Sequence, residues 1–148
     1  MAETLGSLCD KLTIVKLKQF HSTDALRLHS LTTQENALCE EINTFLADAV
    51  AGRTRLDKLI FPSNKVYERK GNEIAAITGD IGLVFSELAK TNCDLWHEQE
   101  KVYQFELVAI EKKNGVVKQL ALLNLKRNQC IDAIDTAFQG IILRSNTP

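Results

Sequence analysis

The sequence has few of the features that mark membrane proteins, nucleic-acid-binding proteins or disulfide-rich domains. Its 148 residues include two prolines, one tryptophan and four cysteines, and 18 basic residues nearly balance 19 acidic ones. No apolar run approaches the ~18 residues of a membrane-spanning helix, so we expect no membrane insertion. The net charge of -1 gives no reason to expect nucleic acid as a partner.

The cysteines are too far apart in the sequence to form a zinc or redox motif. Cys9, Cys39, Cys93 and Cys130 include no C-x-x-C pair. We expect reduced thiols in a cytoplasmic protein, with no metal and no cofactor. The N-terminal residues lack a basic segment followed by an apolar one, so we expect no signal peptide.

The common catalytic motifs are absent as well. The sequence contains no phosphate-binding loop of the G-x-x-x-x-G-K-[ST] type, no G-x-G-x-x-G and no G-x-S-x-G. A di-iron bundle needs two Glu-x-x-His pairs, and the nearest match, Asp94-x-x-His97, is better interpreted as a surface ion pair. Whether the protein is an enzyme is therefore left open.

Four segments carry the apolar periodicity of packed α-helices. In each, apolar residues recur at alternating spacings of three and four. The predicted helices cover about residues 4–20, 24–51, 73–105 and 112–142, with N-caps at Thr4 and near Asp24 and a C-terminal glycine at Gly52. Gly79 and Gly82 weaken the start of the third helix, so Thr78 or Asp80 is an alternative N-cap for it. We predict a single all-α domain over residues 1–148, either a four-helix bundle or an elongated pair of antiparallel helical hairpins.

A basic connector separates the second predicted helix from the third. Residues 53–71 contain six basic and two acidic residues, and Pro62 breaks the helical periodicity. Two interpretations stay open. The connector is either a solvated crossover loop or a basic lid over an anion site.

The last predicted helix carries polar residues within its apolar stripe. Positions 120, 124, 127, 131, 134, 138 and 141 form the stripe, and two of them are Asn124 and Arg127. Asn128 and Asp135 lie at its edge. Because an isolated buried charge is very costly, Arg127 requires solvent or an acidic or amide partner from a neighbouring helix.

Hairpin geometry predicts which residues share the level of Arg127. If the last two helices turn near Ile110, Asn92 faces Asn128. If the first two turn near Ser22, Asp10 lies near the level of Glu35. Packing both hairpins at the same height collects one polar layer, with Trp96 beside it: Asp10, Glu35, Asn92, Asn124, Arg127 and Asn128.

This layer has two interpretations, which the sequence does not separate. Buried polar groups can fix helix register, as a buried asparagine does in coiled coils. Alternatively, the layer lines a pocket in which an arginine, asparagines and a tryptophan face hold a carboxylate, phosphate or sugar.

Three ordered motifs occur along the chain. They are Leu5-Gly6-x-x-x-Asp10-Lys11-Leu12-Thr13-Ile14, then Asn92-x-x-Leu95-Trp96, then Asn124-x-x-Arg127-Asn128-x-x-Ile131-x-x-Ile134-Asp135. In these motifs the chain resembles an uncharacterised bacterial family of all-helical domains. The resemblance implies a cytoplasmic helical bundle associated with surface-sugar or glycosyl-transfer functions, and it implies no particular reaction.

We therefore expect a non-enzymatic helical interaction or accessory module. Long helices leave apolar flanks that a small bundle does not cover, so we expect a homo-oligomer or a protein partner. The alternative is an enzyme or binding protein for a small anionic or sugar-derived ligand. Its candidate residues are Arg127, Asn124, Asn128, Asn92, Trp96 and Asp10.

Overall fold

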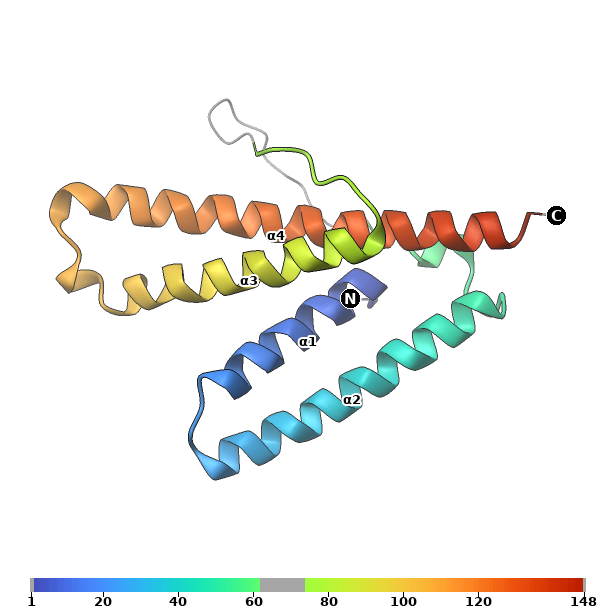
Figure 1. Cartoon of the computed structure of the whole chain (residues 1–148), viewed down its shortest axis with the longest axis horizontal. Helices are drawn as coiled ribbons and strands as arrows, with labels where there is room; N and C mark the ends of the chain where they lie inside the picture. The colour runs from blue at the N-terminus through green and yellow to red at the C-terminus, as the bar shows by residue number, and fades with distance from the viewer. Residues whose placement is uncertain (1, 62–73, 148) are drawn as a thin grey trace.

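The described part of the chain is built from two antiparallel helical hairpins. The structure is a computed structural model that describes residues 2–61 and 74–147. These residues form α1 (Leu5–Phe20), α2 (Ala25–Val50), α3 (Ile81–Tyr103) and α4 (Ile110–Ser145), with short 3-10 helices η1 (Leu56–Lys58) and η2 (Phe105–Leu107) and no strand. The predicted all-α fold is confirmed. Figure 1 shows the α1–α2 and α3–α4 hairpins meeting at one end and spreading apart toward their turns.

The helix starts follow capping chemistry, with one correction. Thr4 forms a capping box with Ser7, and the Asp24 side chain accepts from the Arg27 amide at 2.7 Å. The third helix begins at Ile81 rather than near residue 73. Gly79 has a φ of 128°, a conformation that cannot continue an α-helix.

The other boundaries lie closer to those predicted. Gly52, with a φ of 71°, follows the end of α2 as a C-terminal glycine. The last helix starts at Ile110 and runs to Ser145, slightly beyond the predicted 112–142 at both ends. Of the basic connector, residues 53–61 contain η1 and the fully buried Leu59. Residues 62–71 of the connector lie outside the described residues.

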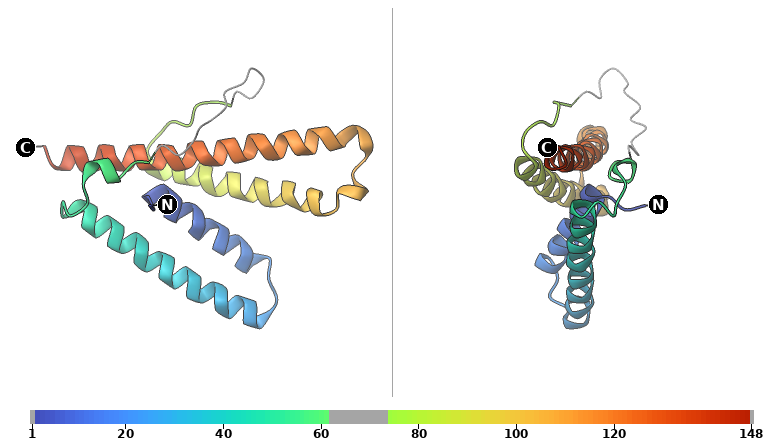
Figure 2. Two further views of the ribbon diagram at one scale, coloured as in Figure 1. Left: turned by 180° about the vertical axis from the view of Figure 1, so that it is seen from behind. Right: turned by 90° about the vertical axis from the view of Figure 1, so that its right-hand side faces the viewer.

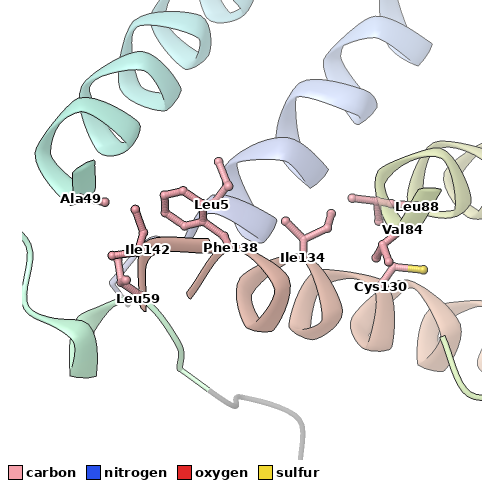
Figure 3. Packing of buried hydrophobic residues seen from close by; sticks show 9 residues of the cluster. All are labelled: Leu5, Ala49, Leu59, Val84, Leu88, Cys130, Ile134, Phe138 and Ile142. Atoms are coloured by element: carbon pink, nitrogen blue, oxygen red, sulfur yellow. The ribbon is translucent and has the colours of Figure 1, made fainter. Parts of the chain in front are cut away.

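The apolar core lies at the end where the hairpins meet. Figure 3 shows nine buried residues from the four helices and the segment after η1 converging there: Leu5, Ala49, Leu59, Val84, Leu88, Cys130, Ile134, Phe138 and Ile142. Burying each large aliphatic side chain contributes roughly 1.5–3 kcal/mol. All four cysteines are free thiols. Among the described helices, none combines the length and apolarity needed to cross a bilayer.

Helix α1 holds the two hairpins together. It packs on α3 and α4 as well as on its own hairpin partner, whereas α2 packs mainly on α1. Near its C-terminus α2 also reaches α4, where the ring centroids of Phe45 and Phe138 lie 6.1 Å apart. The contacts of α1 with α3 and α4 therefore set the angle between the hairpins, and three of the predicted polar residues, Asp10, Asn92 and Arg127, lie at these contacts.

Candidate functional site

The N-terminal turn of α1 crosses α4 so closely that the crossing requires a glycine. A Cβ atom built on Gly6 would lie 2.4 Å from the carbonyl oxygen of Ile131, a backbone atom that cannot rotate away. The Gly6 amide donates to Oδ1 of Asp135 at 2.7 Å. The missing side chain thus lets an α4 carboxylate bind the first turn of α1, where unpaired amides favour negative charge.

Asp135 is almost completely buried at this crossing, with 1% of its surface exposed. The pKa of its carboxyl is raised to about 6, mainly by burial and to a smaller extent by the nearby Asp132, while hydrogen bonds from Gly6 and Thr4 lower it. Close to neutral pH, a buried carboxylate here is held by neutral donors. The negative charge of Asp135 therefore destabilises the folded state.

A second buried aspartate lies further along α1 and is held differently. Arg127 of α4 donates from Nε and Nη2 to the two carboxylate oxygens of Asp10, at 2.8 and 2.5 Å. Asn92 of α3 donates from Nδ2 to Oδ1 of Asp10 at 3.0 Å. Residues from three helices therefore meet at one carboxylate, and we call Asp10, Asn92 and Arg127 the α1 tie.

The α1 tie is asymmetric in its exposure. The side chain of Asp10 is 5% exposed, whereas that of Arg127 is 32% exposed. The hydrogen bond to Asp10 raises the pKa of the Arg127 guanidinium, although partial burial acts against this. Both oxygens of Asp10 are occupied by forked guanidinium geometry, which is the stronger form of such a pair. The carboxylate of Asp10 is therefore held in one orientation by Arg127.

Asn92 is more buried than either charged residue. The residue is 1% exposed, and within the described part of the chain its Oδ1 has no hydrogen-bond partner. An unsatisfied buried carbonyl oxygen costs about 1–3 kcal/mol. Asn92 therefore donates to Asp10 through Nδ2, while its own Oδ1 stays without a hydrogen-bond partner within the described residues.

Three residues of the predicted layer are not part of the α1 tie, and two of them, Glu35 and Asn124, have partners elsewhere. Glu35 of α2 accepts from Lys16 at 2.9 Å and from Gln19 at 2.8 Å, within its own hairpin. Asn124 is exposed and donates to the backbone oxygen of Leu120. The predicted level of Glu35 is wrong because α2 extends beyond the end of α1, which brings Lys16 rather than Asp10 opposite Glu35.

The remaining candidates, Trp96 and Asn128, lie near the tie on α3 and α4. Trp96 stacks on His21 with ring centroids 4.7 Å apart and planes inclined by 10°. Its Nε1 donates to Oε1 of Glu100 at 2.9 Å. Asn128 is half-buried, next to Arg127 on α4. Trp96 therefore marks the far end of the α1–α3 contact.

A cavity of about 400 Å³ reaches the tie from the groove between α1 and α2. Lys11, Lys18 and Arg127 line it together with the carboxylates of Asp10 and Glu41. Its walls also include apolar side chains from both helices. In this cavity a small anion would have cationic neighbours beside the tie.

The described residues near the tie do not favour thiol or metal chemistry. Burial raises the pKa of the Cys9 thiol to about 11, and the charges of Asp135 and Asp10 act in the same direction. A protonated thiol is a poor nucleophile. Within residues 2–61 and 74–147, no group of three or more histidines, cysteines or acids has an arrangement that would hold a metal ion.

Comparison with protein-family models, with curated proteins and with solved structures gives no match to this chain. The resemblance to the bacterial helical family therefore stays a prediction.

Sequence reasoning missed two features of the site. Gly6 was one position within a motif, yet it permits the whole α1–α4 crossing. Lys16 and Gln19 were not assigned to Glu35. The signal for Gly6 was its position one turn before Asp10 on the same face of α1, since four residues make about one helical turn.

Proposed function

We propose that this protein is a non-enzymatic helical interaction module, in which the α1 tie fixes the angle between two hairpins. One observation carries the proposal. Both carboxylate oxygens of the buried Asp10 are already bound by Arg127 and Asn92, so the polar cluster has its partners within the chain. A buried carboxylate paired in this way is suited to fixing register and orientation, as single buried polar residues do elsewhere.

The surface offered to a partner lies at the turn between α3 and α4. Tyr103, Leu107 and Ile110 are each more than three-quarters exposed there. Figure 1 shows this turn far from the shared core, at the free end of the longer hairpin. Exposed apolar side chains gathered at one place mark interaction sites more often than chance exposure does. We propose a bacterial cytoplasmic protein as the partner.

A small anionic or sugar-derived ligand is the alternative, and the cavity beside Arg127 favours it. Lys11 and Lys18 bring two further cations to the same walls. The association of the resembled family with surface sugars makes a sugar nucleotide the natural first probe. In this alternative the tie orients Arg127 and the cavity holds the ligand.

Thermal unfolding with inorganic phosphate and with uridine diphosphate glucose separates the two functions. For an interaction module we expect neither probe to raise the melting temperature. The Lys18→Ala variant serves as a comparison, because Lys18 lines the cavity and is outside the tie. A rise in melting temperature with the original chain, lost in Lys18→Ala, would establish the ligand function instead.

Photocrosslinking tests the interaction surface directly. A photoreactive phenylalanine replaces Tyr103 in one variant and the exposed Ser86, further back on α3, in a control. In cells of the source organism we expect a discrete adduct, heavier than the chain and different from its dimer, from position 103 alone. No adduct at position 103, or the same adducts from both positions, would refute the proposed surface.

A further inference from the structure

One face of helix α2 borders the groove between α1 and α2, and most of its side chains are exposed within the described residues. Figure 2 shows α2 on the outer side of α1, away from α3 and α4 over most of its length. Along this face, residues at alternating spacings of three and four form a continuous row, which we call the α2 stripe. Its members are Arg27, Ser30, Gln34, Ala37, Glu41, Thr44 and Asp48.

The α2 stripe carries opposite charges at its two ends. Arg27 lies near the N-terminus of α2, whereas Glu41 and Asp48 lie in the C-terminal half. Within the described residues, neither Arg27 nor Glu41 forms an ion pair, and Asp48 pairs with the exposed Arg53 at 2.7 Å. Ala37, the smallest side chain of the stripe, lies close to midway between Arg27 and Asp48.

This arrangement is complementary to itself when reversed. A two-fold axis at Ala37 places a second α2 antiparallel to the first, so that Arg27 of one copy lies at the level of the partner's Asp48. Gln34 then lies opposite the partner's Glu41. In a two-fold interface every such contact occurs twice, so each complementary pair contributes twice.

The surface beside the stripe has room for the side chains of a second helix. Two hollows, of about 400 and 500 Å³, lie in the groove between α1 and α2. Both hollows are lined by Ala37 and Glu41. The two hollows therefore lie on either side of the centre of the stripe. Lys18 lies in the first hollow beside Gln34, where it adds a second cation opposite the partner's Glu41.

We propose that two copies of this chain associate through antiparallel pairing of their α2 stripes about Ala37. The partner is a second copy because the stripe's own charge order supplies the complement. This proposal deepens the interaction role proposed above and rests on it for one partner of the module. It uses a surface remote from Tyr103, Leu107 and Ile110, so either proposal can fail alone.

Charge reversal of the full-length chain tests the pairing. Sedimentation equilibrium across the micromolar range should give the dimer mass for the original chain. Arg27→Glu and Asp48→Lys each replace two attractive contacts by two repulsive ones, so each should weaken dimerisation about tenfold or more. The matched controls Lys112→Glu and Glu111→Lys make the same charge changes at exposed positions on α4 and should leave the dimer intact.

Mixing the two stripe variants gives the decisive result. Arg27→Glu paired with Asp48→Lys has two attractive contacts again, so an equimolar mixture should form the heterodimer that neither variant forms with itself. This recovery also shows that both variants are folded. A monomeric original chain, stripe variants that dimerise as well as the controls, or a mixture that stays monomeric would overturn the proposal, and the photocrosslink at position 103 would be unaffected.

Discussion

Helix α1 is fastened to α4 at two levels, and the two levels use different physics. At the first, Asp135 of α4 binds the Gly6 amide, and a close backbone approach does most of the holding. At the second, Asp10 of α1 binds Arg127, and an ion pair does the holding. Both aspartates are buried, yet only Asp10 has a cation as its hydrogen-bond donor.

The difference teaches that a buried carboxylate has no fixed effect on stability. Asp135 is a charge in a poorly solvating site, which is why its pKa is raised to about 6. Asp10 has a guanidinium fork and an amide to replace the water that it loses. Removing a partner should therefore be costly at Asp10, whereas removing the charge should relieve strain on the fold at Asp135.

The largest effect is expected from Arg127→Met. Methionine fills similar space but leaves the Asp10 carboxylate buried with Asn92 alone. Removing one partner of a buried pair costs roughly 3–5 kcal/mol, and water entering beside the half-open guanidinium site should place this case near the lower value. Urea unfolding measures the loss. Lys112→Met, at an exposed position of α4, is the control, and a loss as small as that control's would contradict the account of the tie.

Gly6→Ala should come next. Its Cβ would meet the Ile131 carbonyl oxygen at 2.4 Å, so α1 must move away from α4. Overpacking of this kind costs about 1–3 kcal/mol. Gly82→Ala is a matched control, since a Cβ there meets nothing within 4 Å. Equal stability of the two variants would show that the crossing is loose.

A smaller effect is expected from the titration of Asp135. Its folded pKa of about 6 lies above the unfolded value of 3.8, so the folded state binds the proton more tightly. The destabilisation is complete above pH 6 and is relieved as the pH falls toward 3.8. Between pH 7 and pH 5 this group alone should raise the unfolding free energy by roughly 1 kcal/mol.

Asp135→Asn provides the comparison for that titration. The amide keeps an acceptor oxygen for the Gly6 amide and has no charge to titrate. The difference in unfolding free energy between the original chain and this variant should therefore shrink or change sign on acidification. Parallel pH profiles for the two proteins would show that Asp135 is not the titrating group.

The smallest effect is expected from Glu35→Gln. Glu35 was predicted to join the polar layer, but it binds Lys16 and Gln19 at a solvated position. Exposed ion pairs contribute little to stability, so this variant should unfold at the same urea concentration as the original chain. A loss of unfolding free energy comparable to that of Arg127→Met would show that Glu35 contributes to the buried polar cluster after all.

The sequence carried enough information for the helices and for part of the site. Periodicity located the four helices, and the cost of burying a charge required a partner for Arg127, for which Asp10 and Asn92 were among the candidates. The levels of Glu35 and Asn124 were missed because hairpin register depends on turn geometry and on how far α2 extends past α1. Periodicity defines the face of a helix, and it leaves its axial offset undetermined.

The role of Gly6 could be predicted only in part, for a related reason. A glycine near a helix start has many uses, and only the position of Ile131 on α4 shows which applies here. The angle between the two hairpins could not be predicted from the sequence either. It depends on where α1 crosses α4, which is a contact between residues about 130 positions apart, as the bond from Gly6 to Asp135 shows with its separation of 129.

A double-mutant cycle on Asp10 and Arg127 tests the central claim most directly. The unfolding free energies of Asp10→Asn, Arg127→Met and the double variant give the coupling between the two side chains. If the tie fixes the hairpins, each single variant should lose stability, the double variant should lose less than the sum, and the coupling should be about 2 kcal/mol or more. Additive losses, with coupling below about 0.5 kcal/mol, would contradict the claim that this pair holds the two hairpins together.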